Sequence, residues 1–271
     1  MEDKTRTVHI DTSIQIERCK GPKKAERVEE SLRVFRFKST SSYAKFEFKR
    51  AWLRDLAYLY HASETVTRLD EIIGYVNNRL DANPQARRRV SRCLEAIQSF
   101  LSRVPGDTSY DAALSRMQSH LRQAILGAYT WWDSSVTHEF KGTGCARAEE
   151  QPKLSGGKLD VAIPRCSRGE IKCAVHEFFA IHRESFTAIR SAIENRGTQA
   201  SKELQKAIRI IDSAEKDSEC LCDGSNCSGL GDILIAIGGL DMDCFAANNN
   251  ADWTMLSEVL HKQLLNPVRG G

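Results

Sequence analysis

Thr7-Val-His-Ile-Asp11-Thr-Ser13 is the stretch that decides the fold of this chain. Residues 7–10 are a short run rich in β-branched side chains, which predicts a strand, and Asp11 follows where that strand ends. A second stretch near the opposite end of the sequence, Gly231-Asp232-Ile-Leu-Ile-Ala236, predicts an apolar helix with an acidic residue at its start. In a parallel α/β sheet, the polar groups that do chemistry collect beyond the carboxyl ends of the strands. The two stretches therefore predict an α/β fold with carboxylates gathered at one edge of a sheet.

A third acidic residue, Glu47, lies in Thr40-Ser-Ser-Tyr-Ala-Lys-Phe-Glu47-Phe. Thr40, Ser41 and Ser42 are good N-cap residues, and the apolar residues that follow at spacings of three and four predict a helix. Glu47 therefore belongs to the first two turns of that helix. Between Asp11 and this helix we expect a surface helix over 20–30 and a second strand over 34–38, where apolar and basic residues alternate.

The segment Cys244-Phe-Ala-Ala247 predicts another strand, followed by a polar turn and a helix. Asn248, Asn249 and Asn250 follow this strand, whereas Asp241 and Asp243 come before it. Because the carboxyl end of a strand is where a site is expected, Asn249 and Asp252 are better candidates than either earlier aspartate.

These four pieces together resemble the PIN-domain nuclease family, over roughly residues 5–63 and 229–265. The family's first acid matches Asp11, its helix glutamate matches Glu47, and its third acid matches Asp232 in Asp-Ile-Leu-Ile-Ala. Its final motif is similar to Ala247-Asn-Asn249-Asn-Ala-Asp252-Trp253, where Ala247 replaces a threonine and Asn249 replaces the commoner aspartate. The resemblance implies a three-layer α/β fold with a central, mostly parallel sheet, interrupted here by a largely helical, cysteine-bearing insertion.

The resemblance also implies Mg²⁺- or Mn²⁺-dependent hydrolysis of phosphodiester bonds, usually in RNA. Asp11 and Asp232 would then hold the metal directly, and Glu47 would bind it through water or orient the attacking water. Asn249 would hydrogen-bond a ligand water, and Asp252 would assist or cap the last helix. The chemistry of the residues agrees with this assignment, because carboxylates gathered in one pocket repel one another unless a hard cation neutralises them. Lys45, Lys49 and Arg50 flank Glu47 and would attract a polyanion.

Three functions stay open at this point. The first is an endoribonuclease of toxin-antitoxin or defence type, acting on single-stranded or structured RNA, and DNA remains an alternative substrate. The second is a catalytically weak PIN-like module that binds nucleic acid or acts as a protein scaffold, which the neutral Asn249 favours. The third is a zinc-dependent nucleic-acid-binding protein without catalysis. An antitoxin or another protein would be a partner of the first, and a homo-oligomer is compatible with each.

The middle of the sequence predicts helices. Residues 64–136 carry three amphipathic patterns separated by Asn83-Pro84 and by Pro105-Gly106-Asp107. Arg87-Arg88-Arg89 fits either a solvated helix face or a contact with nucleic acid. A hairpin is expected around Ser155-Gly156-Gly157, followed by helices over 175–195 and 199–214. We therefore divide the chain into a first core part at 1–63, a helical insertion at 64–228 and a second core part at 229–271.

Six of the nine cysteines lie in two short segments of the insertion. Structural zinc takes four ligands in a closed tetrahedron, commonly two from each of two loops. We expect Cys145, Cys166 and Cys173 to bind zinc together with one cysteine of the later segment, which contains Cys220, Cys222 and Cys227. Reduced thiols and a redox pair are the alternatives, and His176 is a further candidate ligand.

Composition restricts the class of protein further. The 271 residues are 41% hydrophobic and carry a net charge of +3, typical of a globular, soluble chain. No apolar run approaches the roughly 20 residues of a membrane span, and the N-terminal residues lack the pattern of a signal peptide. The sequence therefore predicts a cytoplasmic protein with no membrane partner.

Overall fold

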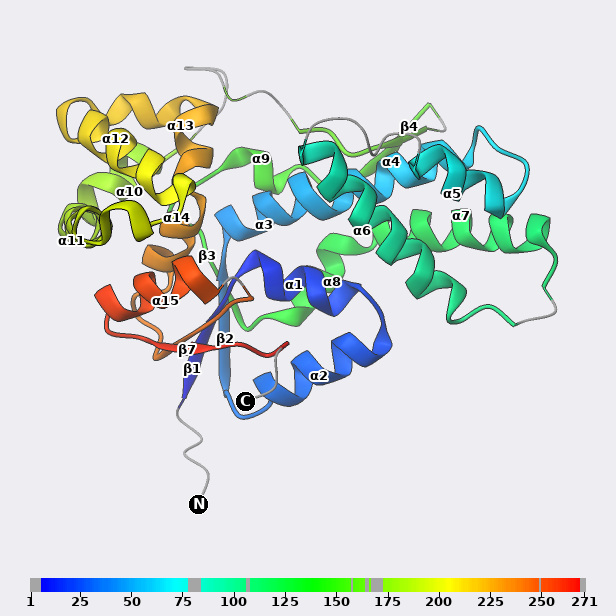
Figure 1. Cartoon of the computed structure of the whole chain (residues 1–271), viewed down its shortest axis with the longest axis horizontal. Helices are drawn as coiled ribbons and strands as arrows, with labels where there is room; N and C mark the ends of the chain where they lie inside the picture. Colours follow the sequence, from blue (N-terminus) through cyan, green and yellow to red (C-terminus); the bar gives the residue numbers. More distant parts are fainter. Residues whose placement is uncertain are drawn as a thin grey trace.

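A five-stranded sheet lies at the centre of the chain, and all of its strands are parallel (Figure 1). The computed structural model describes residues 6–77, 84–105, 108–156, 158–163, 166, 173–248 and 250–268. The sheet order is β3-β2-β1-β6-β7. Its strands are β1 (Thr7–Ile10), β2 (Phe37–Ser41), β3 (His138–Phe140), β6 (Cys244–Ala246) and β7 (Gln263–Leu265). The expected α/β class with a parallel sheet is confirmed.

Helices cover both faces of the sheet. Val8 and Ile10 of β1 pack in one cluster with α1 (Thr12–Cys19) and α2 (Pro22–Leu32). His9 points to the opposite face, where α14 (Gly231–Gly238) ends so close that a Cβ on Gly239 would lie 2.5 Å from His9 Cγ. On that face Phe245 of β6 packs against Trp253 of α15 (Asn250–Val259), with ring centroids 5.4 Å apart. The alternating side chains of the strands therefore produce a three-layer arrangement.

The second strand begins later than the sequence predicts. Residues 34–38 were expected to form it, but Val34 is 48% exposed and the Phe35 N–H donates to the Leu32 carbonyl. These residues form the turn that follows α2, and Phe35 packs into the hydrophobic cluster beneath β1. The alternating apolar and basic residues therefore lie partly in a turn and only partly in the strand. Ser41 at the end of β2 caps α3 (Ser42–Phe48), as expected, by accepting from the Ala44 N–H at 3.1 Å.

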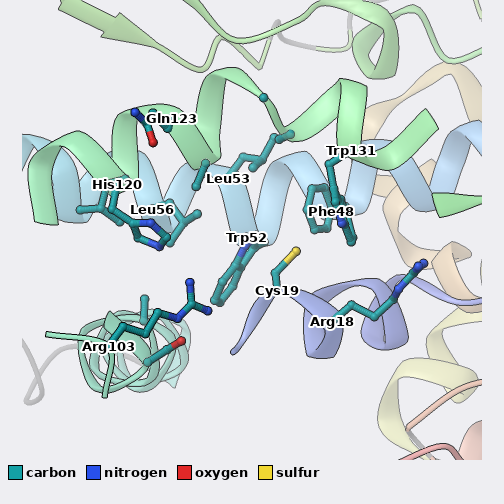
Figure 2. A pocket seen from close by; sticks show the side chains of 16 residues that line it. Arg18, Cys19, Phe48, Trp52, Leu53, Leu56, Arg103, His120, Gln123 and Trp131 are labelled. Carbon is teal, nitrogen blue, oxygen red and sulfur yellow. The ribbon is translucent and has the colours of Figure 1, made fainter. Parts of the chain in front are cut away.

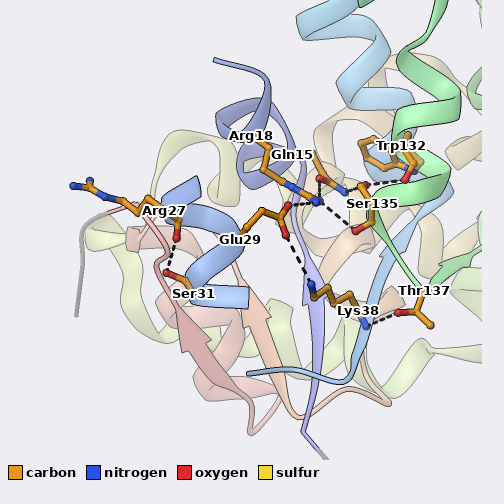
Figure 3. Close-up of polar contacts among 9 residues, drawn as sticks. All are labelled: Gln15, Arg18, Arg27, Glu29, Ser31, Lys38, Trp132, Ser135 and Thr137. Atoms are coloured by element: carbon orange, nitrogen blue, oxygen red, sulfur yellow. Dashed lines mark hydrogen bonds and ion pairs between the residues drawn. The ribbon is translucent and has the colours of Figure 1, made fainter. Parts of the chain in front are cut away.

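The edge strand β3 comes from the segment assigned to the insertion. It pairs with β2, and polar contacts fix the preceding α8 (Ala128–Ser135) to α1, which is itself joined to α2 (Figure 3). Gln15 Nε2 donates to Ser135 Oγ at 3.1 Å, and Arg18 Nη1 donates to the Ser135 carbonyl at 3.3 Å. Arg18 also pairs with Glu29 of α2. Residues 64–228 thus contribute one strand to the central sheet.

The remaining helices form two groups at opposite ends of the molecule (Figure 1). At one end, α3 continues through a π-helical turn (Lys49–Leu53) into α4 (Arg54–Ser63), which packs with α5 (Leu69–Asn77), α6 (Pro84–Leu101) and α7 (Tyr110–Leu126). The other end contains α10 (Val175–Ile181), α11 (Arg183–Arg196), α12 (Lys202–Lys216) and α13 (Gly224–Gly229). Short elements complete this part of the chain: α9 (Ala146–Glu149), the 3₁₀ turns η2 (Gly197–Gln199) and η3 (Ser218–Cys222), and the expected hairpin of β4 (Lys153–Ser155) and β5 (Lys158–Asp160).

Among the helices of the described residues, none combines the length and the apolar character that crossing a bilayer requires.

Candidate acidic site

An acidic cavity of about 530 Å³ opens where α14 and α15 face α12. Glu47 and Asp232 line it, together with Asp252 and Glu203. The other lining residues are Arg88, Ser201, Leu204, Ala207, Ser228, Gly229, Leu230, Gly231, Ile233 and Ala251. Asp11 lies close enough to Glu47 and Asp232 for its charge to add to the rise in pKa that burial causes in both. The three carboxylates matched to the PIN family therefore come together, although Asp232 lies near the opposite end of the sequence from the other two.

Asp11 lies directly beyond β1 and is held by its own helix. Its carboxylate accepts the Ser13 N–H at 2.9 Å, capping α1, and also accepts from the Ser13 hydroxyl. Ser13 Oγ in turn accepts the Asn248 N–H at 3.1 Å. These bonds join the ends of β1 and β6, between which the strand order of the sheet reverses. In parallel α/β sheets, binding sites usually form at this point.

Glu47 projects from α3 toward the start of α14. Thr12 Oγ1 lies 3.5 Å from Glu47 Oε2, and Arg50 Nη2 lies 3.8 Å from Glu47 Oε1. Burial raises the pKa of Glu47 to about 7, with Arg50 acting against this rise and Asp11 adding to it. Glu47 is thus a buried carboxylate whose ionisation depends on a nearby positive charge.

Asp232 lies in the first turn of α14 and does not cap it. The N-cap position is Leu230, and no side-chain capping bond is made there. Asp232 is therefore not a helix cap. Burial first, and then the charges of Asp11 and Glu47, raise the pKa of Asp232 well above its usual range. A carboxylate placed without a cap bond among other acids is typical of a functional site.

The acidic cavity also contains residues that the sequence does not predict. Asp252, an expected member, accepts from Ser201 Oγ at 3.1 Å, and both Ser201 and Glu203 come from the α12 region. No local signal marks Glu203, because only tertiary packing brings it to the cavity. Asn248 carried a signal, since it directly follows β6. Its buried side-chain oxygen has no hydrogen-bond partner among the described residues. Asn249 lies outside the described residues.

The donor set suits a hard divalent cation. Carboxylate and amide oxygens are the ligands that Mg²⁺ and Mn²⁺ prefer, and a cation would relieve the repulsion that raises the pKa values of these acids. Within the described parts of the chain, His176, Glu219 and Cys222 are the one group of three such residues whose ligand atoms all lie within 4.8 Å of one another. Asp11, Glu47 and Asp232 are therefore more widely spaced.

The positive charge around the cavity differs from the prediction. Lys45 is engaged by Asp133 at 3.0 Å and by Glu139 at 3.1 Å, and the buried Lys49 donates to the carbonyls of Arg147 and Glu150. Neither lysine is exposed to a polyanion, so the prediction is wrong for Lys45 and Lys49, whereas Arg50 does lie beside Glu47. Arg50 and the exposed Arg88 are the basic residues that the structure places near the acids.

A second cavity, of about 420 Å³, lies between α1, α4, α6 and α7 and is mainly aromatic and aliphatic (Figure 2). Trp52, Phe48 and Trp131 line it, and Arg18, Arg103 and His120 supply its charged or polar groups. Its lining contains no carboxylate among the described residues. Trp132 is buried beside it against Phe48, with ring centroids 5.1 Å apart, and so belongs to the core. The acidic cavity is thus the better candidate for chemistry.

Comparison with family models, with curated proteins and with solved structures gives no match to this chain.

Gly231→Ala is expected to disturb the acidic site while leaving the fold intact. A Cβ on Gly231 would lie 2.6 Å from Glu47 Oε1, so the Glu47 carboxylate must move. The helix itself tolerates alanine, whose helix propensity is about 1 kcal/mol better than that of glycine. Urea unfolding should give a midpoint close to that of the wild type, and binding of Mn²⁺ should be weaker. Unchanged binding would show that the position of Glu47 does not matter.

Proposed function

We propose that this protein is a metal-dependent nuclease of the PIN-like type, acting on RNA through the acidic cavity. The observation that carries the proposal is the convergence of Asp11, Glu47 and Asp232, each with a raised pKa, beside the carboxyl ends of β1 and β6. The preference for RNA comes from the family resemblance of the motifs around these residues. The three-layer parallel sheet supports the same assignment.

Each residue of the site has a role that follows from its position. Asp11 and Asp232 would hold Mg²⁺ or Mn²⁺, which when bound lowers the pKa of water and stabilises charge on phosphate oxygens. Ser13 holds the Asp11 carboxylate in one orientation, and the Asn248 N–H holds Ser13. Glu47, with a pKa of about 7, is suited to accept a proton from the attacking water at neutral pH.

Arg50 and Arg88 would meet the phosphates of the substrate. Arg88 lines the cavity together with Asp232, and Arg50 lies beside Glu47. A cavity of about 530 Å³ accepts a nucleotide-sized segment of a single strand more readily than a duplex. We therefore place single-stranded RNA first among the substrates.

The alternative is a PIN-like module that binds nucleic acid or a protein and cuts slowly or not at all. The specific observation in its favour is the spacing of the three carboxylates, whose ligand atoms do not all lie within 4.8 Å of one another. The distinction between the two functions is whether catalysis accompanies binding.

The proposal predicts that the purified protein cleaves a fluorescently labelled single-stranded RNA in Mn²⁺ or Mg²⁺ and not in EDTA. Single-stranded DNA and duplex RNA of the same sequence serve as comparison substrates, and cleavage products are resolved on a denaturing gel. Metal-dependent cleavage of DNA alone would reject the RNA assignment. Binding of RNA without any cleavage in either metal would favour the alternative function.

A further inference from the structure

A cluster of thiols and one imidazole lies where η3 packs against α10, apart from the acidic cavity. Cys173 precedes α10, His176 lies in its first turn, and Cys222 ends η3. Cys166 lies beside Cys222, with its Sγ 3.2 Å from the Cys222 carbonyl. None of the nine cysteines, all of which lie within the described residues, forms a disulfide. Nothing in the proposed nuclease function uses this cluster.

The geometry is close to that of a zinc site. Cys222 Sγ lies 3.8 Å from His176 Nδ1 and 3.8 Å from Glu219 Oε2, and Glu219 Oε1 lies 3.8 Å from His176 Nε2. Sulfur and nitrogen ligands of tetrahedral zinc are about 3.5 Å apart, given Zn–S of about 2.3 Å and Zn–N of about 2.0 Å. The Cys222–His176 pair is therefore already near the separation that one bound ion would impose.

We propose that Cys222, His176 and Glu219 bind one Zn²⁺ ion and that the neighbouring Cys166 supplies the fourth ligand. Among the described residues, the ligand atoms of the first three all lie within 4.8 Å of one another. Thiolate sulfur, imidazole nitrogen and carboxylate oxygen are all zinc ligands, and four of them close a structural site. This set differs from the sequence-based expectation, in which Cys145 and Cys173 were ligands and His176 only a candidate.

Cys145 and Cys227 have a different role in this arrangement. Both are buried in the main hydrophobic cluster, and the Cys227 carbonyl accepts a hydrogen bond from the Tyr43 hydroxyl at 3.2 Å. They fill space beneath the metal ligands. Cys227 lies on α13, which leads into α14 and Asp232, so the zinc site would anchor the segment that positions one acid of the nuclease site.

Zinc content and Co²⁺ substitution test the proposal without any measurement of nuclease activity. Protein purified under reducing conditions without chelator should contain about one Zn²⁺ per chain, and Co²⁺ should give the visible absorption of a tetrahedral thiolate site. Cys222→Ser should abolish that absorption, and Glu219→Gln should weaken Zn²⁺ binding by about 10- to 100-fold. Glu219 is mostly exposed, so its replacement tests the ligand geometry in a folded protein.

Two control variants separate this site from the other cysteines. Cys93→Ser changes a buried thiol between α4 and α6 and should leave metal content unchanged. Cys145→Ala should also retain Zn²⁺, and its loss there would reject the proposed ligand set. Absence of zinc from the wild type, or binding by Cys222→Ser equal to that of the wild type, would overturn the site altogether. Because metal content is read directly, these outcomes are independent of whether the protein cuts RNA.

Discussion

Asp11→Asn and Asp232→Asn are each expected to reduce RNA cleavage by about 10²- to 10⁴-fold, the equivalent of several kcal/mol of lost transition-state stabilisation. Each change removes a charged oxygen ligand and keeps the size of the side chain. Neither should unfold the protein. In the Asp11→Asn variant, the amide oxygen can still accept the Ser13 N–H that caps α1, and Asp232 makes no capping bond that could be lost.

In EDTA the Asp232→Asn protein should be at least as stable as the wild type. Asp232 is buried beside Asp11 and Glu47, and their charges disfavour its ionised form. Removing one of several like charges relieves this repulsion. The combination of lost activity and retained stability, measured by cleavage rate and urea unfolding, is characteristic of a metal site. Asp243→Asn is the matched control, because Asp243 lies before β6 at the opposite end of the sheet, where it accepts from the Thr7 N–H at 2.8 Å. If Asp243→Asn and Asp232→Asn lose activity equally, the site is misassigned.

Asp55→Ala is expected to lower the free energy of unfolding by about 3 kcal/mol. Asp55 on α4 is 1% exposed and pairs with Arg89 at 2.9 Å and with Arg92 at 2.5 Å, both on α6. Removing the carboxylate leaves two guanidinium groups facing an apolar contact, although both retain some access to water. Urea unfolding followed by circular dichroism measures the change.

The control for this effect is Asp70→Ala, which removes a partner of Arg68 where both side chains are about half exposed. Surface ion pairs of this kind contribute about 0–1 kcal/mol. Equal losses in the two variants would contradict the view that the Asp55 pair holds α6 against α4. A loss near zero for Asp55→Ala would do the same.

The elements that sequence reasoning located carry strong local signals. The strand before Asp11 is marked by β-branched residues, and the helix of Glu47 is marked by the Ser41 cap that the structure contains. These signals depend only on neighbouring residues, so they can be read without a fold. The same is true of the β4–β5 hairpin around Gly156.

The elements that it missed depend on tertiary contacts. Strands β3 and β7 contain three residues each, too few to show a period, and they exist because a neighbouring strand offers hydrogen bonds. The acids and bases of the site follow the same division. Asp11 and Glu47 could be predicted from their positions in local elements. Glu203 and Arg88 line the cavity only because helices distant in the sequence pack together. Lys45 and Lys49 instead interact with Asp133 and with the Glu150 carbonyl, which are also distant in the sequence.

Binding of Mn²⁺, followed by electron paramagnetic resonance, tests most directly whether the three carboxylates form a metal site. Titration of the wild-type protein should show bound Mn²⁺ that Mg²⁺ displaces, and Asp11→Asn and Asp232→Asn should each bind it far more weakly. The Asp243→Asn control should match the wild type. Mn²⁺ binding that is absent from the wild type, or unchanged in both site variants, would contradict the assignment of Asp11, Glu47 and Asp232 as the metal site of a nuclease.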